Sequence, residues 1–65
     1  MKGFIEVTQL AGSFNMPYRA FLRVKDISGI MEGDNDEAEI IIGGQIIHVE
    51  ESVIMVKSLI NEASK

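Results

Sequence analysis

Residues 38–63, AEIIIGGQIIHVEESVIMVKSLINEA, decide the fold of this chain. Two apolar runs flank Gly43-Gly44, and a pattern with helical spacing follows directly. A two-residue loop of this kind requires a backbone with positive φ, which glycine adopts without strain. We therefore predict a tight β-hairpin that leads into a C-terminal helix.

The glycine pair also predicts which hairpin residues lie opposite each other. Counting outward from the loop gives the pairs Ile42–Gln45, Ile41–Ile46, Ile40–Ile47, Glu39–His48 and Ala38–Val49. Opposed residues share a face, and faces alternate along a strand. One face is therefore apolar except for Gln45 at its tip, and we expect it to belong to the core. The other face combines two isoleucines with Glu39 and His48, which indicates a partly covered surface.

The predicted helix begins near Ser52, a good N-cap residue, and the acidic pair Glu50-Glu51 suits the positive helix end. Its apolar stripe, which we expect to pack on the sheet, consists of Val53, Val56, Leu59, Ile60 and Ala63. Ile54 and Met55 lie outside this stripe. We expect both side chains to remain exposed when the apolar stripe packs on the sheet.

The first half of the chain contains three further candidate strands, at residues 4–10, 18–24 and 27–32. Gly12-Ser13 predicts a turn, residues 15–17 a break before proline, and residues 33–37 a polar loop. We therefore expect a single small domain over residues 1–65 of the α+β class. Its core would be a small bent antiparallel sheet, or a partly open barrel, of about five short strands with one C-terminal helix.

Composition limits what such a chain can do. A domain of 65 residues buries only about 60% of its unfolded surface. It has no cysteine and one histidine, so disulfides are excluded and a structural zinc site is not expected. With 46% hydrophobic residues and no other internal staple, self-association is the remaining means of stabilisation, and we expect a homo-oligomer.

The charge balance is acidic, with ten Asp and Glu against six Lys and Arg and a net charge of -4. A uniformly basic nucleic-acid binder would look different. The first ten residues lack the apolar region of a signal peptide, and no apolar run is long enough for a membrane span. A cytoplasmic protein is the expectation that remains.

Three segments resemble the FlbD-like family of small swarming-motility proteins. IEVTQLAG at residues 5–12 is similar to the opening strand and turn of that family, and Ile27 matches its midchain isoleucine. Residues 40–60 resemble its closing strand, glycine turn, strand, Glu-Ser step and helix. The chain departs from the family at residues 15–17 and 33–37, which lengthen its middle. The resemblance implies a small intracellular accessory protein that works by contact. Hairpin-plus-helix patterns of this kind also recur in small bacterial and phage proteins, and we expect an unidentified protein partner.

No catalytic residue, metal ligand set or cofactor site is predicted. His48 has Glu39 opposite it, but a metal site or a catalytic histidine requires further convergent groups, so a structural or interfacial pair is the better interpretation. The acidic residues 34–39 lack the glycine and the final acid of a calcium-binding EF-hand loop.

Two surfaces remain as candidate binding sites. The preferred one is an apolar self-association surface with a polar margin, formed by Glu39, Ile41, Ile46, His48, Ile54 and Met55, with Met31 as a further candidate. The alternative is single-stranded nucleic-acid binding. If the second strand extends to residue 25, one of its faces carries basic residues interleaved with an aromatic, namely Arg19, Phe21, Arg23 and Lys25.

Overall fold

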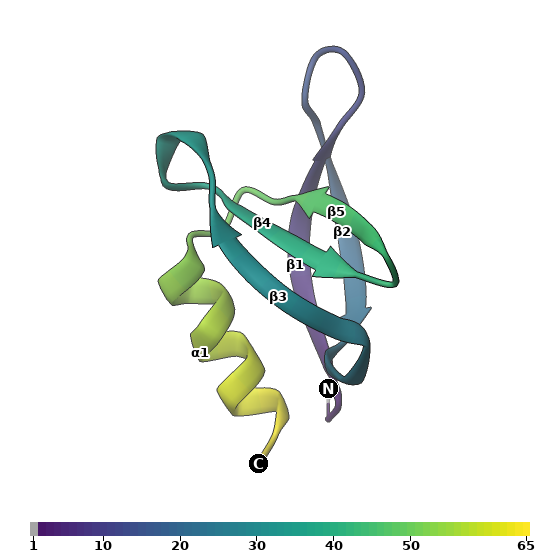
Figure 1. Ribbon diagram of the computed structural model, residues 1–65, viewed down its shortest axis with the longest axis vertical. Helices are drawn as coiled ribbons and strands as arrows, with labels where there is room; N and C mark the ends of the chain where they lie inside the picture. The colour runs from purple at the N-terminus through teal and green to yellow at the C-terminus, as the bar shows by residue number, and fades with distance from the viewer. Residues whose placement is uncertain (1) are drawn as a thin grey trace.

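The computed structural model describes residues 2–65, which form five β-strands and one α-helix (Figure 1). In chain order the elements are β1 (Phe4–Ala11), β2 (Met16–Arg23), β3 (Ile27–Glu32), β4 (Ala38–Ile42), β5 (Gln45–His48) and α1 (Val53–Ala63). Short 3₁₀ turns at Val24–Asp26 and Asp34–Asp36 lie before and after β3. The predicted α+β class, with antiparallel strands and one C-terminal helix, is confirmed.

The strands are divided between two antiparallel sheets, which do not close into a barrel. β1 pairs with β2, and β4 lies between β3 and β5. The hairpin of β1 and β2 crosses behind the three-stranded sheet, with α1 beside both (Figure 1). One isolated bridge, between Gln9 and Val49, joins the two sheets directly.

Four of the five pairs that the glycine pair predicts form the ladder of β4 and β5. The fifth, Ala38–Val49, is not a ladder pair, because the Ala38 N–H donates to the Glu51 carbonyl and Val49 forms its bridge with Gln9. Ile42 pairs with Gln45, and the next three pairs follow without a shift as far as Glu39 and His48. Both loop glycines have positive φ, 56° at Gly43 and 77° at Gly44. A register shifted by one residue would exchange the core face for the exposed face, so this turn decides which isoleucines are buried.

Residues 49–51, which we call the connecting segment, join the two sheets by alternating hydrogen bonds. The Val49 N–H donates to the Ala38 carbonyl at 3.0 Å, and the Ala38 N–H donates to the Glu51 carbonyl at 2.8 Å. Between them, the Glu50 N–H donates to the Thr8 carbonyl at 2.8 Å. The Glu51 carboxylate in turn accepts the Thr8 N–H, with N···O distances of 2.8 and 3.1 Å. This short segment therefore fastens β1 to β4.

The helix begins as expected, because the Ser52 hydroxyl accepts the Met55 N–H at 3.2 Å. The apolar stripe of the helix faces the core, and Val56 and Ala63 are buried. The buried core draws on both sheets and the helix and consists of Ile5, Val7, Leu22, Ala38, Ile40, Val49, Val56 and Ala63. Apolar burial between these layers is the main favourable term for a chain of this size.

The second strand differs from the prediction at both ends. It begins at Met16 rather than at residue 18, because Asn15 takes the positive φ of the turn (49°) and Pro17 continues in the strand. Proline is tolerated there because β2 pairs only with β1 and is a sheet edge. The strand ends at Arg23, and Lys25 lies in the following 3₁₀ turn. By contrast, β3 has the predicted bounds.

Candidate interaction surfaces

The face of the three-stranded sheet that points away from the core is the first candidate surface. We call it the exposed sheet face, and its residues are Gly29, Met31, Glu39, Ile41, Ile46 and His48. Ile46 is 62% exposed and Met31 is 38% exposed. The opposite face of the same strands holds Ala38 and Ile40, which are completely buried.

Gly29 leaves room on this face for the side chain of Ile41, next to an irregularity in the pairing of β3 with β4 between Ile27 and Gly29. It lies opposite Ile41 on the neighbouring strand and has no side chain of its own. A Cβ atom at Gly29 would lie 3.4 Å from Cδ1 of Ile41, so the isoleucine side chain extends over the glycine. Ile41 is consequently half-buried, and Ile46 on the next strand is the more exposed of the two isoleucines.

The polar margin of the exposed sheet face differs from the predicted pair. Glu39 lies opposite His48 in the register, but the His48 ring bonds to Glu37, with 2.8 Å between Nε2 and Oε1. Diagonal neighbours of this kind are within reach of long side chains. The Glu39 side chain instead packs against Gly33, where an added Cβ would lie 3.3 Å from Glu39 Cγ.

Ile54 and Met55 are exposed, as the helix pattern predicts, but on a different surface. Ile54 is 82% exposed and lines a hollow of about 410 Å³ together with Val53, Ser52, Glu32 and Asp36. Glu32 lies opposite Ala38, so its side chain is on the core side of the sheet, where the helix packs. The six predicted interface residues therefore occupy two surfaces, with Ile41, Ile46, Glu39 and His48 on one and the helix pair on the other.

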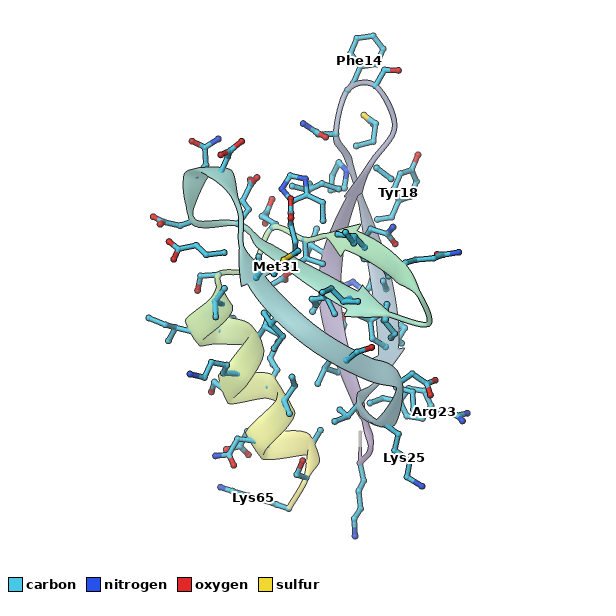
Figure 2. All side chains as sticks on the ribbon, in the orientation of Figure 1. Phe14, Tyr18, Arg23, Lys25, Met31 and Lys65 are labelled. Atoms are coloured by element: carbon cyan, nitrogen blue, oxygen red, sulfur yellow. The ribbon has the colours of Figure 1, made fainter. Side chains whose placement is uncertain are left out.

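Arg19, Phe21 and Arg23 are exposed residues on one face of β2, as the alternative prediction requires. Two of these three already have partners within the chain. Arg19 forms an ion pair with Glu6, and the Arg23 guanidinium lies 5.7 Å from the centre of the Phe4 ring. Lys25 is off the strand, but its side chain lies at the same end of the molecule as that of Arg23 (Figure 2). The two residues line a hollow of about 230 Å³.

Sequence reasoning missed a third surface, the far end of the hairpin of β1 and β2. Phe14 is 87% exposed at its tip, where Figure 2 shows the ring pointing away from the rest of the molecule. Met16 and Tyr18 are also more than half exposed. A signal was present in the sequence, because residues 7–18 contain no charged residue although 25% of the chain is charged.

We next ask whether a metal site or a known relative indicates what these surfaces bind. Among residues 2–65, no three or more His, Asp or Glu side chains are grouped so that they could hold a metal ion. No helix in the same residues has the length and apolar character needed to cross a membrane. No family model, curated protein or solved structure matches the chain. The fold and its surfaces define a class only, a small α+β protein built from two antiparallel sheets and a C-terminal helix.

Proposed function

We propose that this protein is a non-enzymatic contact module that associates with itself through the exposed sheet face. The observation that carries the proposal is the exposure of Ile46 beside Ile41, whose side chain extends over Gly29. Exposed apolar patches of this kind commonly mark protein interfaces. We call Ile41 and Ile46 the apolar row of this face. A twofold axis over the face would place Ile46 of each copy against the apolar row of the other.

The size of the exposed sheet face sets the strength of this association. Three strands spaced about 4.8 Å apart, each about five residues long, cover on the order of 200 Å². A standard stable interface buries about 800 Å² from each partner. We therefore expect a weak, concentration-dependent dimer, which would require neighbouring residues to enlarge the contact before it became permanent.

The hydrogen bond between His48 and Glu37 lies at the edge of this face and supports the same proposal. It holds the imidazole beside the apolar row, and both side chains remain partly exposed. Interfaces typically have an apolar centre and a polar rim. In this arrangement Ile46 and Ile41 form the centre, and His48 forms part of the rim.

The resemblance to the FlbD-like family agrees with a contact role and extends the proposal to an accessory protein of the cytoplasm. The resemblance implies no catalytic motif that would have to be placed in the structure. The exposed sheet face provides a surface for such a contact. An unidentified protein could occupy this face in place of a second copy.

Sedimentation equilibrium over a series from micromolar to millimolar protein tests the proposal. The expected result is a dimer that grows with concentration and is lost in Ile46→Asp, because a charge on the apolar row opposes its burial. Ile54→Asp is the matched control, since Ile54 is at least as exposed but lies on the other surface. A monomer at every concentration, or an equal effect of the two variants, would refute the proposal.

A further inference from the structure

The far end of the hairpin of β1 and β2 projects from the molecule as an uncharged apolar arm. We define the arm as residues 10–18. Its base is fixed at Thr8, which bonds to Glu50 and Glu51, and at Gln9, which forms the bridge to Val49. Beyond that point the two strands pair only with each other, and the loop stands clear of the other elements (Figure 1).

The two strands of the arm carry apolar side chains on both faces, and its polar residues Ser13 and Asn15 lie in the turn. Leu10 and Pro17 form a pair on one face, and Ala11 and Met16 form the next pair on the opposite face. Phe14 occupies the tip at 87% exposure. A flat protein surface could cover only one of these faces, so the arm suits an environment that surrounds it.

The residues at the base of the arm change from apolar to charged side chains. Tyr18 is 57% exposed and combines an apolar ring with a hydroxyl, a side chain that is favoured where a membrane meets water. Arg19 follows it directly and forms an ion pair with Glu6 across the hairpin. The pair leaves the base without a local excess of positive charge, and the whole chain carries -4.

We propose that the arm inserts its tip into the interfacial layer of a zwitterionic lipid bilayer. Phe14 lies four positions before Tyr18, which corresponds to at most about 13 Å because Phe14 and Asn15 belong to the turn. Amphipathic elements bury their apolar side about 5–10 Å into the boundary between headgroups and acyl chains. The reach of the arm is therefore sufficient for Phe14 to enter this layer while Arg19 and Glu6 stay in water.

The hydrogen bonding of the arm's backbone is compatible with insertion into the interfacial layer. Its two strands satisfy their facing N–H and C=O groups by pairing, and the Asn15 N–H donates to the Gly12 carbonyl at 3.2 Å within the turn. Groups on the outer edges lack such partners, so they require the water that the headgroup layer retains. Insertion is thus limited to the interface and does not extend to the hydrocarbon core. The inference is independent of self-association through the exposed sheet face.

Co-sedimentation with phosphatidylcholine vesicles at millimolar lipid tests the proposal. The native chain should bind weakly, and Phe14→Ser should lower the partition coefficient about tenfold, because one large apolar side chain is lost from the interface. Phe21→Ser is the matched control, since Phe21 is an exposed aromatic on the same strand outside the arm. Replacing part of the lipid by phosphatidylserine should weaken binding, given the net charge of -4.

The chain offers a second readout that does not depend on sedimentation. Tyr18 is its only tyrosine and it has no tryptophan, so intrinsic fluorescence reports on the arm. Vesicles should protect this emission from a water-soluble quencher. Folded native protein that fails to bind, or an equal loss in Phe21→Ser, would overturn the proposal. Weaker self-association in Phe14→Ser would also overturn it, since a second copy would then occupy the arm.

Discussion

The carboxylate of Glu51 gives the sharpest test of how the two sheets are held together. Both of its oxygens accept the Thr8 N–H, at 2.8 and 3.1 Å, and the contact is partly buried. Glu51→Ala leaves that N–H without its partner. Hydrogen bonds to charged groups contribute about 1.5–3 kcal/mol, and partial access of water to Thr8 offsets part of this. We therefore expect the free energy of unfolding to fall by about 1–2 kcal/mol.

Thermal unfolding followed by circular dichroism measures this loss. For a domain of this size, each kcal/mol lowers the Tm by about 4–8 °C. Glu50→Ala is the matched control, because it removes the same charge near the helix N-terminus while only the backbone N–H of Glu50 bonds to Thr8. Glu51→Gln retains one acceptor oxygen and should have an intermediate effect.

Hydrogen exchange locates the effect. In Glu51→Ala the Thr8 amide should exchange faster, because its acceptor has been removed, while amides in α1 should change only with global stability. If Glu50→Ala destabilises the protein as much as Glu51→Ala, the loss comes from charge at the helix end. The proposed fastening of β1 by Glu51 would then be wrong.

Two further predictions concern a glycine and the basic strand face. Gly33→Ala should destabilise the protein by about 1–3 kcal/mol in urea unfolding, because the new Cβ would lie 2.9 Å from the Glu37 carbonyl oxygen. Gly29→Ala should cost much less, since its nearest neighbour is the movable end of a side chain, and equal costs would contradict this reasoning. The chain should not be retained on single-stranded DNA or RNA at low salt, because its net charge is -4 and both arginines of the strand face have internal partners. Retention that falls with salt and is lost in Arg19→Glu/Arg23→Glu would establish the alternative function.

Most of the fold could be predicted from local patterns in the sequence. The glycine pair determined the loop, and from the loop the alternation of side chains determined every pair of β4 and β5. Ser52 and the spacing of the apolar residues after it determined where α1 begins and which side is buried. These features depend on neighbours within a few residues, so a single sequence contains the information needed to predict them.

Contacts between distant parts of the chain could not be predicted in this way. Glu51 is 43 residues from Thr8, and its position suggested only a favourable charge near the helix N-terminus. The division of the candidate interface into two surfaces also depends on how α1 packs against the sheets. Burial on one face of an element can be predicted from its pattern, but the arrangement of the elements depends on side-chain packing across the whole core.

The connecting segment links the prediction for Glu51 to the proposed insertion of the arm. It holds Thr8 two residues before the arm begins, so the arm leaves the molecule from a fixed base while its tip remains free. A preorganised hairpin loses less conformational freedom on binding than a flexible one, which favours insertion. Glu51→Ala removes no apolar group from the arm, yet it should weaken vesicle binding if a rigid base matters. Unchanged binding in that variant would mean that the exposed side chains alone determine the affinity, and that the fastening of β1 serves stability only.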